Sequence, residues 1–265
     1  MGGKDSKPVV QATPPVSRST GDEKSTPASL KKKTLDKKRD VVVAHTFRAK
    51  KELPASAAKK GKLSGKLDET LTTHQRKMEQ GMDGDPLLKE LIKLPEGEEL
   101  NDWLGVNTIH FFNIASMVYG TILPRCTGSS CPETTAGSKY QYYWADADGS
   151  PRSVAAREYM SRLFDWIETQ IADPAVFPVD DGAVYPENYQ QVVGAIFKRL
   201  FRVYAHVYYS HFEQVKELGA ESHLNSSFQH FAYFVLEFHL IPEEELRPLK
   251  KLIAKLVPGY AASGH

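Results

Sequence analysis

Residues 188–211 read NYQQVVGAIFKRLFRVYAHVYYSH. Apolar side chains recur in this stretch every three to four positions, which predicts a helix from Asn188 to about Ser210. The same stretch carries three closely spaced cations and two histidines, so one helix is expected to hold two kinds of polar group. The rest of the predicted fold is arranged around it.

Helical spacing continues on both sides of this stretch. It predicts helices over residues 87–92, 101–120 and 155–167, one after a cap residue Asn225, and a last one with Pro242 at its first turn. Residues 140–144 have strand composition and 147–149 supply a turn, which predicts a short hairpin. The fold class is therefore mostly α: a helical bundle with one small β-hairpin.

The formal net charge of +1 over 265 residues hides a division at residue 66. Residues 1–66 carry 17 Lys and Arg against 6 Asp and Glu, with one aromatic residue, whereas residues 67–265 carry 17 against 27. The first segment has too little apolar surface to offset its ordering entropy. We expect a disordered basic regulatory tail at 1–66, a linker or switch segment at 67–82, a helical domain at 83–258 and a flexible C-terminus at 259–265.

Several classes of protein are excluded by what the sequence lacks. No apolar run approaches the roughly 18–20 residues of a membrane helix, and the N-terminus has no apolar stretch typical of a secretory signal. The common phosphate-loop, dinucleotide, hydrolase and metalloprotease motifs are missing. The acidic domain is a poor match for nucleic acid, so we expect no specific binding to it.

Two cysteines and two histidines are candidates for a metal site. Cys126 and Cys131 lie five residues apart in a turn-rich loop, and His206 and His211 have the same spacing. This is the ligand set of a closed structural zinc site. Residues five apart on an ideal helix differ by about 140°, so both imidazoles reach one ion only if the helix bends or ends there. The alternatives are a buried cysteine pair with two unrelated histidines, or a thiol nucleophile at Cys131.

Two charged clusters are candidates for binding surfaces. Lys198, Arg199 and Arg202 share one side of the predicted helix and suit a phosphate or phosphopeptide, although they also suit a solvated face paired with nearby acids. An acidic cluster lies beside Trp103 at the start of another predicted helix and comprises Glu96, Glu98, Glu99 and Asp102. It either docks a basic partner helix or is merely a charged helix start.

The N-terminus fits the pattern for N-myristoylation, with Gly2 as acceptor and Ser6 at the required offset. One acyl chain gives marginal membrane binding, to which the basic run at 31–39 would add electrostatic attraction. We therefore expect weak membrane contact through the N-terminus if Gly2 is acylated. The alternative is an unmodified tail.

Several separated motifs resemble one family. They are LPEGEELNDW at 94–103, YGTI at 119–122, the cysteine pair, KRLFRVYAH at 198–206 and HLNSSF at 223–228. Together, over about residues 83–257, they strongly resemble the Mob (Mps-one-binder/phocein) family. The first motif resembles the founding subgroup that works with NDR/LATS-type AGC kinases.

The resemblance implies a non-enzymatic kinase coactivator and scaffold in Hippo and mitotic-exit signalling and cytokinesis. It implies that the Cys and His positions hold structural zinc and that Lys198, Arg199 and Arg202 receive phosphorylated segments of Ste20-like upstream kinases. It also implies a kinase-docking face, which comprises Glu98, Glu99, Asp102, Trp103 and His230.

Regulation and location are further expectations from the resemblance. Thr46 and Thr70 stand in surroundings that look like those of the family's two regulatory threonines. We expect the protein in the cytoplasm, with the spindle pole or centrosome, basal body, cleavage site, nucleus and membranes as open locations. The alternatives are a phocein-like scaffold of a striatin–phosphatase assembly and a zinc- or thiol-dependent enzyme.

Overall fold

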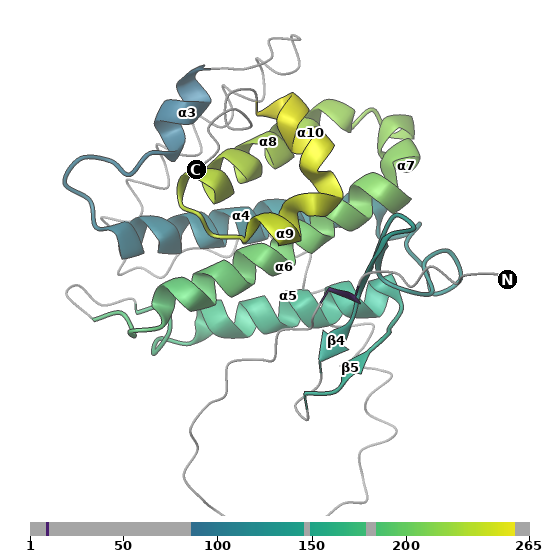
Figure 1. Cartoon of the computed structure of the whole chain (residues 1–265), viewed down its shortest axis with the longest axis horizontal. Coiled ribbons are helices and arrows are strands. Elements are labelled where there is room, and N and C mark those ends of the chain that lie inside the picture. Colours follow the sequence, from purple (N-terminus) through teal and green to yellow (C-terminus); the bar gives the residue numbers. More distant parts are fainter. Residues whose placement is uncertain (1–8, 11–85, 146–148, 179–183, 258–265) are drawn as a thin grey trace, which may run out of the picture.

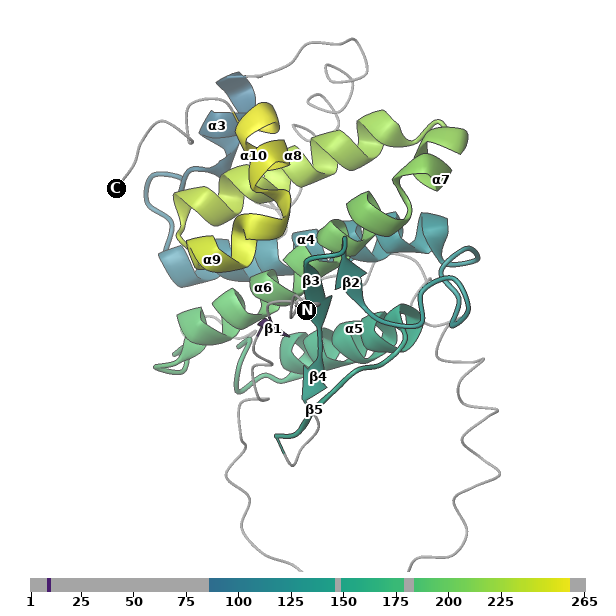
Figure 2. The same cartoon turned by 45° about the vertical axis from the view of Figure 1, so that its right-hand side comes forward.

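The computed structural model describes residues 9–10, 86–145, 149–178 and 184–257. Its helices are α3 (Pro86–Ile92), α4 (Leu100–Ile122), α5 (Ala156–Ala172), α6 (Tyr189–Ser210), α7 (Phe212–Glu217), α8 (Glu221–Glu237), α9 (Glu243–Leu246), the 3-10 turn η1 (Arg247–Leu249) and α10 (Lys250–Leu256). The four long helices α4, α5, α6 and α8 lie alongside one another, as Figures 1 and 2 show. The predicted helical bundle is confirmed.

The centre of the bundle is the packing of α4 against α6. Gly105 allows this close approach, because a Cβ there would lie 2.9 Å from the hydroxyl oxygen of Tyr189. Along α6, 14 of the 22 residues are buried. A cluster of phenylalanines fills the space between α4, α6 and α8, with Phe111 and Phe197 each within 5.5 Å of the Phe234 ring centroid. The apolar residues of the quoted stretch thus pack against both α4 and α8.

The strands are short and lie beside one end of the bundle (Figure 2). β2 (Thr135–Ala136) and β3 (Tyr140–Tyr142) pair antiparallel, with Thr135 opposite Gln141, and β4 (Trp144–Ala145) and β5 (Pro151–Arg152) form a second antiparallel pair. The β4–β5 pair corresponds to the predicted hairpin, whereas the β2–β3 pair was not predicted. β1 (Val9–Val10) pairs in parallel with β3, a contact that the composition of residues 1–66 gave no reason to expect.

One predicted helix start is wrong. Asn225 is not the cap of the helix in which it lies, because α8 begins four residues earlier, at Glu221. Its side-chain oxygen instead accepts a hydrogen bond of 2.9 Å from the Tyr208 hydroxyl, which ties α8 to α6. Among the helices that the structure describes, none has the length and apolar character required to cross a membrane.

Candidate metal centre and charged surfaces

The two cysteines lie in a compact turn that follows α4. The Cys131 amide donates to the Thr127 carbonyl at 2.8 Å, and Thr127 and Ser130 exchange hydrogen bonds between their amides and side-chain hydroxyls. The Cys131 carbonyl in turn accepts from the amide of Ala156, the first residue of α5. The Ser- and Thr-rich sequence between the cysteines therefore folds on itself and holds both thiols at buried positions.

The two histidines come from the end of α6. His206 is inside the helix, whereas His211 follows its last residue with φ −136° and ψ 11°. The helix thus ends between the two imidazoles. This is the condition under which both imidazoles were expected to reach one ion. The His206 Nδ1 lies 3.0 Å from the Thr135 carbonyl, which fixes this nitrogen as the N–H donor and turns Nε2 toward the cysteines.

The four side chains meet in one place. Cys126 Sγ lies 3.6 Å from His206 Nε2, and Cys131 Sγ lies 3.4 Å from His211 Nε2. All four donor atoms are within 4.8 Å of one another. A tetrahedral ion bound to sulfur at about 2.3 Å and nitrogen at about 2.0 Å separates the two ligands by roughly 3.5 Å. The cluster could therefore hold a metal ion.

Burial favours the neutral forms of His206, His211 and the Cys126 thiol by shifting their pKa values. It lowers the pKa of His206 to about 4 and also lowers the pKa of His211. It raises the pKa of the Cys126 thiol, and the adjacent Cys131 adds to that rise while Tyr119 opposes it. A bound cation would stabilise the thiolates, whereas a buried thiol with a raised pKa is a weak nucleophile.

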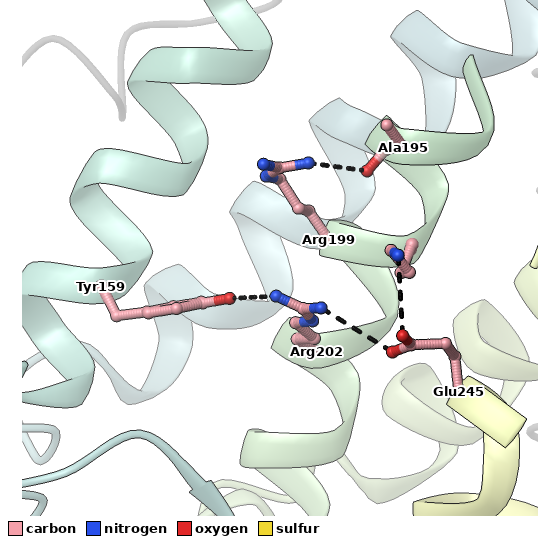
Figure 3. A network of polar contacts seen from close by, with 6 residues as sticks. Tyr159, Ala195, Arg199, Arg202 and Glu245 are labelled. Atoms are coloured by element: carbon pink, nitrogen blue, oxygen red, sulfur yellow. Dashed lines mark hydrogen bonds and ion pairs between the residues drawn. The ribbon is translucent and has the colours of Figure 1, made fainter. Parts of the chain in front are cut away.

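The basic cluster of α6, defined as Lys198, Arg199 and Arg202, is buried rather than solvated. The Arg202 side chain is only 3% exposed, and one of its terminal nitrogens donates to the Tyr159 hydroxyl at 2.7 Å. Its other terminal nitrogen lies 3.7 Å from Glu245, and the Lys198 ammonium lies 3.6 Å from the same carboxylate. One carboxylate on α9 therefore serves two cations, and Figure 3 shows Arg202 between Tyr159 and Glu245.

Arg199 is held against an aromatic ring. Its guanidinium lies 4.0 Å from the centroid of Trp166, and a terminal nitrogen reaches the Ala195 carbonyl at 3.4 Å (Figure 3). Burial, with the nearby charge of Arg202, lowers the pKa of Arg199 to about 10, which leaves it charged at neutral pH. Burial also lowers the pKa of Lys198, an effect that Glu245 opposes. The structure places all three cations on α6, with Lys198 and Arg202 at Glu245 and Arg199 at Trp166, and their role in binding phosphopeptides stays a prediction.

The predicted kinase-docking residues divide between surface and core. Glu98 and Glu99 are exposed at the start of α4, and Asp102 accepts a hydrogen bond of 2.6 Å from the Tyr185 hydroxyl. Trp103 is buried and donates from its indole nitrogen to the Ile92 carbonyl. His230 is buried with its ring 4.6 Å from that of Phe111. Trp103 therefore supports this face from beneath, whereas His230 lies in the core against the middle of α4.

Other predicted sites fall outside the described residues. These are Gly2, Thr46 and Thr70, together with the segments at 67–82 and 259–265 and, apart from Val9–Val10, the tail at 1–66.

The most important residue that the sequence did not single out is Glu245. It lies 43 positions or more from its partners, and the acids at 243–245 gave no signal beyond a helix start. The same applies to Tyr159 and Trp166, which lie within the helix predicted at 155–167 and were given no role.

The fold and the cluster define a class, a helical domain with a closed Cys2His2 donor set. A model of the Mob1/phocein family matches residues 80–249, which is more than half of the chain. The chain is 46% identical over 217 residues to "MOB kinase activator-like 1A" of Arabidopsis thaliana, a match that covers 81% of this chain and 95% of that protein.

Two relatives from other lineages give the same result. The chain is 46% identical to "MOB kinase activator-like 1 homolog A" of Dictyostelium discoideum, which covers 69% of this chain and 87% of that protein. It is also 46% identical to "MOB kinase activator 3A" of Bos taurus, over 69% of this chain and 83% of that protein. The chain belongs to the Mob1/phocein family.

Proposed function

We propose that this protein is a non-catalytic kinase coactivator that binds the basic N-terminal regulatory region of an NDR/LATS-type kinase. The observation that carries this proposal is the exposed acidic start of α4, where Glu98 and Glu99 stand beside Asp102. Relatives that bear the name kinase activator support the same role. The pathway would be of the Hippo or mitotic-exit type, with a role in cytokinesis.

The start of α4 suits a basic helix for two reasons. The N-cap residue Glu99 makes no side-chain capping hydrogen bond to α4, so within the described part of the chain its exposed carboxylate is available to a cationic partner. Beneath them, Trp103 fixes the end of α3 to α4 through its bond to Ile92, and Tyr185 fixes Asp102. The acids therefore stand on a rigid base, which reduces the entropy lost on binding.

A second proposed site is the basic cluster of α6, for a phosphorylated segment of a Ste20-like upstream kinase or scaffold. Glu245 occupies the place opposite Lys198 and Arg202, but its contacts of 3.6 and 3.7 Å are longer than close charge-assisted hydrogen bonds. A phosphate dianion, with more charge and three acceptor oxygens, would compete with this carboxylate. Binding would thus require Glu245 to move away from Arg202.

The Cys2His2 cluster is proposed to bind structural zinc. Sulfur and imidazole donors suit zinc, and four protein ligands would leave no position for a substrate. By linking the turn at 126–131 to the end of α6, the ion would hold together segments that lie 75 residues or more apart. This arrangement favours an adaptor over a zinc- or thiol-dependent enzyme.

Control by the N-terminal segment is a further part of the proposal. Its cations would lie against the acidic start of α4 and compete with the kinase, and phosphorylation of Thr46 and Thr70 would add about 1.5–2 negative charges each and weaken this contact. Acylation at Gly2 would add a membrane-bound pool to a cytoplasmic one.

The test is binding of the full chain to a synthetic basic regulatory segment of an NDR/LATS-type kinase. Glu98→Lys with Glu99→Lys should reduce affinity at least about ten-fold through charge repulsion. Glu133→Lys with Glu213→Lys changes the same charge at exposed positions elsewhere and should have little effect. Equal losses in the two variants would reject the docking face, and purification from cells with striatin and phosphatase subunits instead of a kinase would favour the phocein-like alternative.

A further inference from the structure

A second basic region lies between the β2–β3 turn, the end of α6 and the C-terminal segment. A groove of about 510 Å³ is lined by three cations, Lys139, Arg247 and Lys251, and by Tyr140, Tyr208 and Tyr209 among others. All three cations are exposed, and within the described part of the chain none of them forms an ion pair or hydrogen bond. They differ in this from Lys198 and Arg202, which share Glu245.

The walls of the groove are fixed by contacts on three sides. The Tyr209 hydroxyl donates to the Pro248 carbonyl at 2.9 Å, which joins the end of α6 to η1. Gly137 has φ +68°, and a Cβ there would lie 2.8 Å from the Tyr209 ring, so the β2–β3 turn rests directly on that ring. Tyr209 is nevertheless 51% exposed. The hollow is therefore a built feature with an aromatic wall that remains open to solvent.

We propose that this groove docks an acidic segment of a partner protein, whose carboxylates are bound by Lys139, Arg247 and Lys251. No acid is among the described residues that line the groove, and Glu243 on the adjacent α9 is already paired with Lys250 at 2.9 Å. The three cations therefore present an unbalanced positive charge to whatever enters.

The shape and charge of the surroundings favour a peptide over other polyanions. A membrane surface is flat and would not follow a groove of this volume. A long nucleic acid would extend beyond the groove. Residues 67–265 carry 27 acids against 17 bases, so the surface around the groove would repel it. A short extended segment confines its charge to the groove, and its apolar or aromatic side chains would pack on Tyr209.

The test is fluorescence anisotropy with the full chain and a labelled peptide of about ten residues in which glutamate alternates with serine around a central tyrosine. Lys139→Gln, Arg247→Gln and Lys251→Gln together should weaken binding at least about ten-fold. The matched control, Lys89→Gln, Lys93→Gln and Lys216→Gln, removes three exposed lysines outside the groove and should change affinity by less than about two-fold. Lys198→Gln should have as little effect, which separates this groove from the basic cluster of α6.

Several results would overturn the inference. They are no binding of the glutamate peptide at low salt, equal binding of a peptide with glutamine in place of glutamate, and equal losses in the groove and control variants. Tighter binding of single-stranded oligonucleotides or of anionic vesicles through the same three cations would assign the groove to another partner. None of these outcomes bears on the acidic start of α4, so the proposed kinase contact stands or falls separately.

Discussion

The two halves of α6 bury polar groups in opposite ways. Its last turn and the residue that follows bring His206 and His211 to two cysteines, and burial favours the neutral forms of both histidines and of Cys126. Its middle buries Arg202 and most of Lys198, which keep their charges and share a carboxylate from α9. The first cluster could hold a cation from outside the chain, whereas the second has a counter-charge, Glu245, within the chain. Loss of a metal donor should therefore unfold the region around the first cluster, whereas loss of one charged side chain should change the stability and the binding of the second.

The largest effect is expected at the metal cluster. His211→Ala should abolish metal binding and lower the melting temperature by more than about 10 °C, because the ion would no longer link the turn at 126–131 to the end of α6. Metal content per chain and thermal unfolding followed by circular dichroism measure both effects. Chelation of the wild-type protein should give the same loss, and Ser129→Ala, in the exposed part of the same turn, should retain both properties. If the variant binds no metal but keeps its stability, the cluster has no structural role.

A smaller loss is expected when a cation is removed from the basic cluster of α6. Arg202→Met should cost about 3 kcal/mol, because Glu245 and the Tyr159 hydroxyl lose their shared buried partner. Urea denaturation measures this change. Combining it with Glu245→Gln should cost less than the sum of the two single changes, since both changes remove the same ion pair. Strict additivity of the two changes would show that Arg202 and Glu245 are not coupled.

The carboxylate itself should matter less for stability than for binding. Glu245→Gln should cost about 1 kcal/mol and raise affinity for a phosphothreonine peptide about five-fold, since the competing charge is removed. Titration calorimetry measures the binding, and Glu244→Gln, an exposed acid on the same helix, serves as the control. Weaker phosphopeptide binding in Glu245→Gln would mean that this side chain positions the cations instead of competing for them.

The sequence predicted the components of both clusters better than their environments. The metal donors followed from residue type and spacing, and the helix end required for His211 could be stated in advance from the geometry of a helix. The burial of Arg202 could not, because the charge pattern of a helix looks the same whether it faces water or another helix. Nor could the role of Glu245, since a contact between α6 and α9 depends on packing that local spacing does not encode.

The residues of the predicted kinase-docking face also show that the sequence does not reveal which side chains are buried. Exposed Glu98 and Glu99 could be recognised as charged at a helix start, but Trp103 and His230 look like surface candidates until the core is assembled around them. Asn225 was mistaken for a cap because a favourable capping residue also occurs inside helices, where Tyr208 provides its partner. Local preference was overruled in each case by a tertiary contact.

The smallest effect should separate charge from packing within the basic cluster of α6. Arg199→Lys keeps the positive charge but loses the planar group that lies 4.0 Å from the Trp166 ring, so we expect a cost of about 0.5 kcal/mol. Trp166 emission should shift at the same time, because the ring gains access to water. The control is Arg162→Lys, which retains an exposed i,i+4 pair with Glu158 and should leave both stability and emission unchanged. If Arg199→Lys behaves like this control, the positive charge alone accounts for what Arg199 contributes to stability, and its stacking on Trp166 contributes nothing.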